Sequence, residues 1–139
     1  MWLSGVQAEM VLRLLLAAGL GGIIGAQREW KGKPAGVRTL SVISLGAALF
    51  AVVSELGFLG GDPSRVAAGV VTGIGFLGAG AILHRGGGVE GLTTASAIWV
   101  VAGIGMAAGA GLYWIAVIVA LVVLLLLLIP HIPPPKNKD

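Results

Sequence analysis

The chain has no cysteine among its 139 residues, which excludes disulfide bonds, thiolate nucleophiles and sulfur-ligated metal sites. Charged residues are also scarce: they make up 11% of the chain, against about 25% in a typical soluble domain. Two histidines and six acidic residues leave little from which to build a metal cluster. The composition therefore argues against thiol, redox and multi-ligand metal chemistry.

The usual signatures of enzymes are missing as well. The glycine-rich run lacks the lysine that would complete a nucleotide-binding GxxxxGK[ST] loop. No Ser/His/Asp set is recognisable, and the two histidines lie at the edges of apolar stretches. We expect a protein that is not an enzyme and needs no cofactor. The net charge of +3 comes from Lys and Arg flanking apolar stretches, so we expect no binding to nucleic acid.

What the chain does have is apolar sequence. Hydrophobic residues make up 57% of it, and the mean hydropathy is +1.00. About 20 apolar residues are needed to cross the hydrocarbon core of a bilayer. On this scale five spans are predicted, at residues 6–26, 39–57, 66–84, 92–108 and 112–129. The fold class is an all-α polytopic membrane protein, a compact bundle of about five transmembrane helices.

The predicted membrane domain covers residues 1–130, and residues 131–139 form a short Pro/Lys tail. No Lys or Arg precedes the first apolar run, which itself carries Glu9 and Arg13. We therefore expect a retained span there and not a cleaved signal peptide.

The orientation follows from the basic residues. A cluster lies between the first two spans, at Arg28, Lys31, Lys33 and Arg38. The positive-inside rule places that loop in the cytoplasm. Alternation of the spans then puts the N-terminus outside and the C-terminal tail inside.

Glu9 and Arg13 stand four residues apart inside the first span, in the acid-first order that favours an ion pair on a helix. One interpretation is an interfacial pair near the outer end, with Arg13 reaching toward water. The other is a polar group that faces the bundle interior, where charge usually marks function.

Glycine is concentrated in the third span, at five positions from Gly69 to Gly80. Each would cost about 1 kcal/mol relative to alanine in a soluble helix, whereas in membranes glycine lets helices approach closely. Because these glycines fall on two sides of the helix, we expect the third span to lie at the bundle centre. A stripe of Ser96, Val100, Gly103 and Ala107 makes the fourth span internal too, and the uniformly Leu/Val/Ile-rich fifth span is expected at the periphery. The predicted packing positions are Gly21, Gly25, Gly69, Gly73, Gly75, Gly78, Gly80 and Gly103.

A polar cluster is predicted on the cytoplasmic side, where two loops meet helix ends. Its members are Arg28, Glu29, Arg38, Thr39, Glu90, Thr93 and Thr94. We expect it to be recessed, with Arg28 and Arg38 paired to Glu29. The start of the fourth helix, at Thr93 and Thr94, has free backbone N–H groups that favour an anionic partner.

Simpler interpretations remain open for the same residues. Thr93 and Thr94 are compatible with ordinary helix capping. Arg28 and Glu29 are compatible with a headgroup anchor beside a solvated acid. Glu29 and Glu90 are weak candidates for a metal site, since magnesium is often held by one or two carboxylates and water.

Four blocks of sequence resemble the MgtC/SapB family of bacterial inner-membrane proteins. They are Gly22-Ile23-Ile24-Gly25-Ala26-Gln27-Arg28-Glu29, Ala35-Gly36-Val37-Arg38-Thr39-Leu40, Gly73-Ile74-Gly75-Phe76-Leu77-Gly78-Ala79-Gly80 and Gly91-Leu92-Thr93-Thr94-Ala95-Ser96-Ala97-Ile98-Trp99. The blocks occur in the family's order and cover most of residues 10–110. The resemblance implies a multi-pass protein of the inner membrane, associated with adaptation to low magnesium. It also implies the membrane ATP synthase as a candidate partner.

Together, these features lead us to expect a regulator of magnesium or membrane-energy homeostasis, embedded in the bilayer and acting through helix–helix contacts. The alternative is a small transporter or channel with its path between glycine-rich helices, gated at the polar cluster. A purely structural subunit of a larger complex is a third interpretation. The GxxxG pair Gly21/Gly25 offers a contact face for a homo-oligomer.

Overall fold

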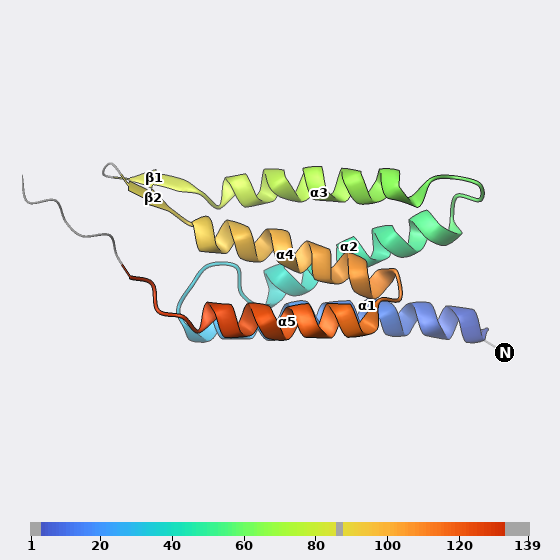
Figure 1. Ribbon diagram of the computed structural model, residues 1–139, viewed down its shortest axis with the longest axis horizontal. Coiled ribbons are helices and arrows are strands. Elements are labelled where there is room, and N and C mark those ends of the chain that lie inside the picture. Colours follow the sequence, from blue (N-terminus) through green and yellow to red (C-terminus); the bar gives the residue numbers. More distant parts are fainter. Residues whose placement is uncertain (1–3, 86–87, 133–139) are drawn as a thin grey trace, which may run out of the picture.

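The computed structural model describes residues 4–85 and 88–132. These residues form five helices and one two-stranded hairpin, which together make an elongated bundle (Figure 1). The elements are α1 (Gly5–Trp30), α2 (Val37–Leu56), α3 (Pro63–Gly80), β1 (Leu83–Arg85), β2 (Gly88–Glu90), α4 (Leu92–Gly109) and α5 (Tyr113–Leu127). The predicted all-α, five-helix architecture is confirmed. The expected tail at 131–139 lies largely outside the described residues.

The hairpin was not predicted, and it shortens the third helix. β1 pairs with β2 in antiparallel register, with Leu83 opposite Glu90. The hairpin extends past the helices at the same end as the loop of residues 31–36 (Figure 1). Gly91 then starts α4 with a φ of +89°, a left-handed conformation that glycine adopts without strain. A side chain there would also overlap the carbonyl oxygen of Ala81.

Three helices are long and apolar enough to cross a membrane: α1, α2 and α4. The helix α5 is also apolar but has 15 residues, or about 22 Å at 1.5 Å per residue. The hydrocarbon core is about 30 Å thick. The described chain is thus a membrane-type bundle in which the helices differ in length.

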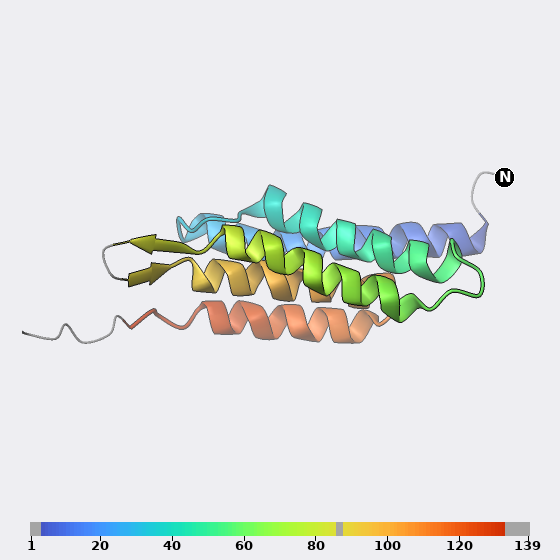
Figure 2. The ribbon, with the colours of Figure 1, turned by 90° about the horizontal axis from the view of Figure 1, so that it is seen from above.

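The centre of the bundle is α4, and the prediction that the third helix lies there is wrong. The helix α4 packs against each of the four other helices. Figure 1 shows it between α3 and α5, and Figure 2 shows the α1–α2 pair running side by side along it. Nine residues of α4 are buried, whereas Gly78 is the one buried residue of α3. Helix α3 is therefore peripheral, with most of its surface uncovered by the protomer.

Close approach of backbones explains why α4 is central. A Cβ atom added at Gly105 would lie 2.8 Å from the carbonyl carbon of Ser44, and one at Gly109 would lie 2.8 Å from the Cα of Ala48. Helix α2 thus lies directly against the glycine face of α4. Sequence inspection missed both glycines because it followed the stripe through Gly103, where an added Cβ would meet no atom within 4 Å.

The other predicted packing glycines divide in the same way. Gly21 and Gly25 pack on α2 and on the residues just before it: an added Cβ would lie 2.8 Å from the Cβ of Ser44 and 2.6 Å from the Cα of Val37, respectively. Gly78 is in ordinary contact with Ala95. Within the protomer an added Cβ meets nothing within 4 Å at Gly69, Gly73, Gly75 and Gly80.

Candidate functional site

Polar side chains collect at the two ends of the bundle. One end holds the loop of residues 31–36 and the hairpin, and we call it the basic-loop end. The other holds the α2–α3 and α4–α5 connections, and we call it the Arg13 end (Figure 1).

At the basic-loop end, consecutive residues in the last turn of α1 bind different helix termini. Gln27 Nε2 donates to the carbonyl oxygen of Leu127 (3.3 Å) and so satisfies the C-terminus of α5. The Glu29 carboxylate accepts from the backbone N–H of Val37 (3.2 Å), the first residue of α2. Successive side chains of a helix diverge by about 100°. This divergence is what lets neighbouring residues serve separate helices.

Arg28, between them, points inward to α4. It is 4% exposed and donates from Nη2 to Thr94 Oγ1. Its Nε donates to the carbonyl oxygen of Pro34 (3.3 Å). The side chain thus ties the end of α1 to the 31–36 loop and to the first turn of α4.

The charge of Arg28 has no counter-charge among the described residues, where both ion pairs involve Arg13 instead. Its acceptors, a hydroxyl and a carbonyl, are neutral. Thr94 lies in the first turn of α4, where the helix dipole is positive. Burying an unpaired guanidinium costs several kcal/mol, so this position is electrostatically unfavourable as it stands.

Glu29 stabilises the turn into α2 through tight backbone packing. A Cβ atom at Gly36 would overlap the Glu29 carboxylate, and one at Gly25 would lie 2.6 Å from the carbonyl carbon of Gly36. Both glycines are therefore required for the approach of α1 to the start of α2. A carboxylate at a helix N-terminus stabilises it by about 0.3–1 kcal/mol.

The predicted ion pairs of Arg28 and Arg38 with Glu29 are not found among the residues the structure describes. Arg28 turns toward α4, and the Glu29 carboxylate is at α2. Of the predicted cluster, the structure brings together Arg28 and Thr94, with Glu29 on the adjacent corner. The remaining members are exposed, and no side-chain hydrogen bond joins them to other described residues: Arg38, Thr39, Glu90 and Thr93. The weak metal candidates Glu29 and Glu90 are likewise both exposed.

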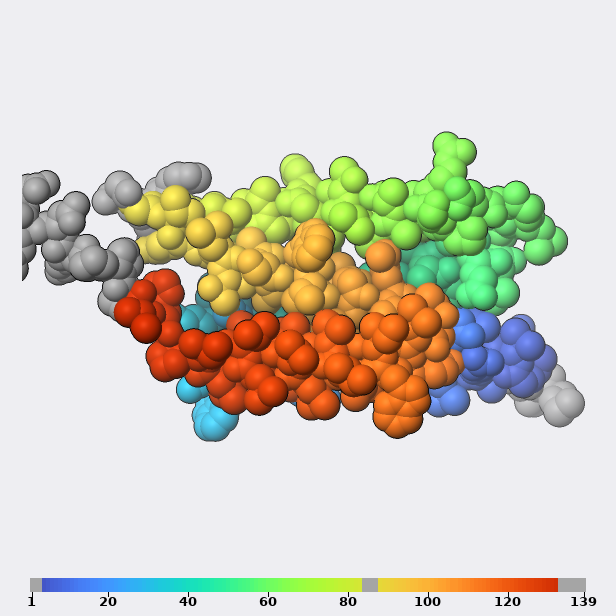
Figure 3. Space-filling view, in the orientation of Figure 1, coloured from blue at the N-terminus to red at the C-terminus, as the bar shows by residue number. Residues whose placement is uncertain are grey.

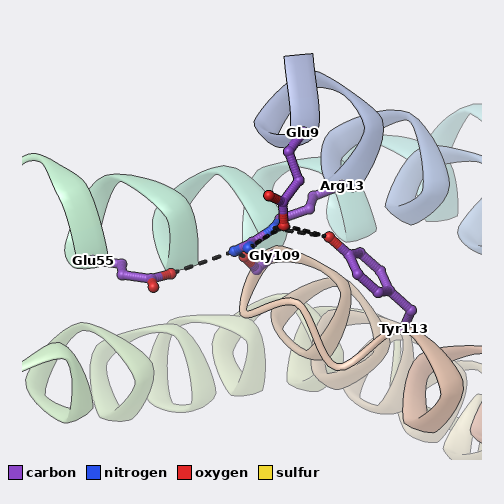
Figure 4. Close-up of polar contacts among 5 residues, drawn as sticks. All are labelled: Glu9, Arg13, Glu55, Gly109 and Tyr113. Carbon is purple, nitrogen blue, oxygen red and sulfur yellow. Dashed lines mark hydrogen bonds and ion pairs between the residues drawn. The ribbon is translucent and has the colours of Figure 1, made fainter. Parts of the chain in front are cut away.

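The Arg13 end holds a second polar cluster, which joins four helices (Figure 4). Arg13 Nη2 lies 2.6 Å from Glu9 Oε1, and Nη1 lies 3.4 Å from Glu55 Oε2. The guanidinium also donates to the Gly109 carbonyl (3.0 Å) and to the Tyr113 hydroxyl (3.2 Å). The same hydroxyl donates to Glu9 (2.9 Å). Arg13 thus connects α1 with α2, α4 and the start of α5.

The sequence predicted part of this cluster. The Glu9–Arg13 ion pair is confirmed. Because the Arg13 side chain is 12% exposed, it lies between helices and does not reach out into water. The contacts of Arg13 with Glu55 and Tyr113 were not predicted. No local pattern signals them, since Tyr113 is 100 residues away in sequence.

Between the two polar ends the bundle is apolar and closely packed. The largest fully buried side chains are those of Ile24, Leu40, Ile104, Val101 and Ser44. Ser44 Oγ is the one buried side-chain polar atom without a hydrogen-bond partner in the described part of the chain.

Hollow space occurs beside the core, between α3 and α5, with α4 as its floor (Figure 3). One cavity there has a volume of about 270 Å³ and is lined by apolar residues, among them Val70, Ile74, Trp99 and Val119. The adjoining groove extends to Thr93 and Ser96 near the basic-loop end. The lining residues of both hollows come mainly from α3, α4 and α5.

Comparison with known proteins assigns the chain to a family. The model of the MgtC family matches residues 14–132. The chain is 53% identical over 114 residues to a protein of Escherichia coli K12 named "Putative magnesium transporter YhiD", covering 76% of this chain and 53% of that protein. It is 46% identical over 101 residues to "Protein MgtC" of Salmonella typhimurium LT2, covering 73% and 43%.

A cyanobacterial protein of Synechocystis, "Uncharacterized protein slr0014", is 44% identical over 110 residues, covering 79% of this chain and 47% of that protein. The chain thus spans about half the length of the curated relatives it matches. No solved structure matches it.

Proposed function

The chain belongs to the MgtC family, and on that basis we propose that it is a multi-pass protein of the bacterial inner membrane that acts in magnesium homeostasis. In this proposal it is a regulator and not an enzyme, and it acts through helix–helix contacts with another membrane protein. The resemblance to the family makes the membrane ATP synthase the candidate partner.

The closely packed core is the observation that favours a regulator acting through contacts over a transporter. Ion pathways through membrane proteins are lined by polar or ionisable groups near mid-membrane. Here the Arg13 cluster and the Arg28–Thr94 pair lie at opposite ends, and closely packed small and apolar residues fill the space between them. This arrangement favours a protein that binds others through its outer surface.

Transport is the second candidate, and the name of the relative YhiD refers to magnesium transport. A path for a hydrated ion would then have to form between copies of the chain or beside α3, where the hollow space lies. The walls of that space are mainly apolar, which disfavours a divalent cation.

Flux measurements separate the two candidates. Purified protein is reconstituted into liposomes that enclose a magnesium-sensitive dye, and an outside-to-inside magnesium gradient is applied. We expect entry at the rate of protein-free liposomes, while the same chain supports growth of a strain lacking its own MgtC-family gene in low magnesium. Protein-dependent uptake that saturates with magnesium would establish transport and overturn the proposal.

We further propose that the basic-loop end faces the cytoplasm, with the N-terminus outside and the C-terminus inside. The cysteine-free chain permits a direct test with Lys33→Cys in the 31–36 loop and Asp62→Cys in the α2–α3 connection. An impermeant thiol reagent added to intact spheroplasts should label the second variant and not the first. Labelling of both from the same side would refute this topology.

Self-association is also part of the proposal. Gly21 and Gly25 are already used against α2 and the residues just before it, so a homo-oligomer must use a different face from the one suggested by the GxxxG pair. The uncovered surface of α3 is the natural candidate. Mass measurement in mild detergent and in nanodiscs tests this, and a strictly monomeric mass in both would contradict it.

A further inference from the structure

The first turn of α4 combines two features that attract an anion. Its cap residue, Gly91, provides no side chain to accept from the first-turn N–H groups. The guanidinium of Arg28 donates to Thr94 in the same turn, so a full positive charge lies at the positive end of the helix dipole. We propose that Arg28 and the N-terminus of α4 form a binding site for a phosphate group, carried either by an anionic lipid headgroup or by a free phosphate ion.

The burial of Arg28 is the observation that points to a ligand. A guanidinium that is 4% exposed normally lies against a carboxylate, because its burial is otherwise unfavourable. The nearest acid in sequence, Glu29, instead accepts from Val37 at the start of α2. A bound anion would supply the charge that the described residues lack.

The geometry leaves part of the guanidinium available. Nε and Nη2 are occupied by Pro34 and Thr94, and no hydrogen bond to the described residues involves Nη1. Nη1 is therefore the nitrogen of Arg28 that a bound phosphate would contact.

Phosphate fits this arrangement better than other anions do. A guanidinium and a set of backbone N–H groups together match several oxygens of one tetrahedral group. Arg28 lies two residues before Trp30, the last residue of the candidate span α1, and the end of such a span would meet the headgroup region of the bilayer. The groove lined in part by Leu92 and Thr93 would give a lipid a lateral approach to the same turn. This inference goes beyond the proposed function and does not depend on it.

A carboxylate supplied by the protein itself provides the test. Thr94→Asp places an acid next to Arg28 and should replace the ligand. Thr93→Asp adds the same charge to the same helix turn on an exposed position, so it controls for the helix-dipole effect. Arg28→Gln removes the charge and keeps a donor for Thr94.

The readout is the thermal unfolding of the purified full chain. In detergent, sodium phosphate is compared with sodium chloride at equal ionic strength. In nanodiscs, phosphatidylcholine alone is compared with phosphatidylcholine containing phosphatidylglycerol. We expect the Tm of the wild type and of Thr93→Asp to rise by roughly 2–8 °C in at least one comparison.

A rise in the detergent comparison alone identifies free phosphate as the ligand, and a rise in the nanodisc comparison alone identifies the lipid headgroup. Thr94→Asp should unfold at a higher temperature than Thr93→Asp without phosphate, and it should not respond to either ligand. Arg28→Gln should not respond either. The proposal is overturned if the wild type responds in neither comparison, if Thr94→Asp responds as the wild type does, or if Thr94→Asp fails to fold.

Discussion

The contact of Gly105 with α2 gives the sharpest prediction about the fold. Gly105→Ala should destabilise the protein, because the new Cβ would overlap the carbonyl group of Ser44 and lie 2.9 Å from its Cα. These are backbone atoms of α2, so relief requires a shift of a whole helix. Gly103→Ala, two residues away on the same helix, would meet nothing within 4 Å.

The size of the effect follows from two opposing terms. Overpacking of a close-packed core by an added methyl group costs about 1–3 kcal/mol. Replacing glycine by alanine in a helix returns roughly 0.4–1 kcal/mol through the unfolded state. We therefore expect Gly105→Ala to lose about 1–2 kcal/mol and Gly103→Ala to be neutral or slightly stabilised.

Thermal unfolding of both variants in the same detergent, followed by circular dichroism, measures the difference. For a chain of this size the expected fall in Tm for Gly105→Ala is roughly 3–8 °C. Equal tolerance of the two substitutions, or a larger loss at Gly103, would show that α4 does not pack against α2 as described here.

Two further predictions concern the Arg13 end. Arg13→Gln should lose about 1–2 kcal/mol of stability, a figure discounted for the half-exposed acids that Arg13 contacts. Arg65→Gln should melt with the wild type, because the exposed Arg65 side chain forms no hydrogen bond or ion pair with the described residues. Equal melting of both variants would contradict the role of the cluster. Gly111→Ala should cost about 1–2 kcal/mol of stability because Gly111 has a φ of +80°. It should cost more than Gly60→Ala, where φ is +78° and the space is open, because the new Cβ at position 111 would also lie 3.2 Å from the Arg13 guanidinium. A smaller loss of stability at Gly111 than at Gly60 in the same melting assay would refute that contact.

The length of the apolar stretches was enough to predict the helical bundle and the approximate start and end of most helices. They could not place the helices relative to one another. The third helix has more glycine than its neighbours, yet glycine allows close approach without specifying a neighbour. Which helices become neighbours is decided by where two helix faces made of small residues fit together, as at Gly105 of α4 and Ser44 of α2.

The candidate site shows the same limit. The sequence pointed to Arg28, Glu29 and Thr94, and the structure joins Arg28 to Thr94. The predicted pairing of Arg28 with Glu29 is not found among the described residues, because adjacent side chains on a helix point in different directions. Gln27 was overlooked because capping the end of α5 is visible only when α5 is in place.

Arg38 illustrates the consequence for mutagenesis. The sequence predicts a recessed Arg38 paired with Glu29, but the side chain is exposed, and no hydrogen bond or ion pair joins it to the described residues. Substitution of Arg28, which is buried and bonded to Thr94, is therefore expected to have the larger effect.

The central claim is that the core between the two polar ends is closed to water and ions. Ser44 tests it directly, since it is 0% exposed, lies at the crossing of α1, α2 and α4, and differs from cysteine by one atom. In membrane fragments that are open to the reagent on both sides, Ser44→Cys in the cysteine-free chain should not react with a small charged thiol reagent until the protein is unfolded. Lys33→Cys should react at once in the same fragments. Reaction of Ser44→Cys in the folded protein at a rate close to that of Lys33→Cys would mean that a water-filled path runs through the bundle.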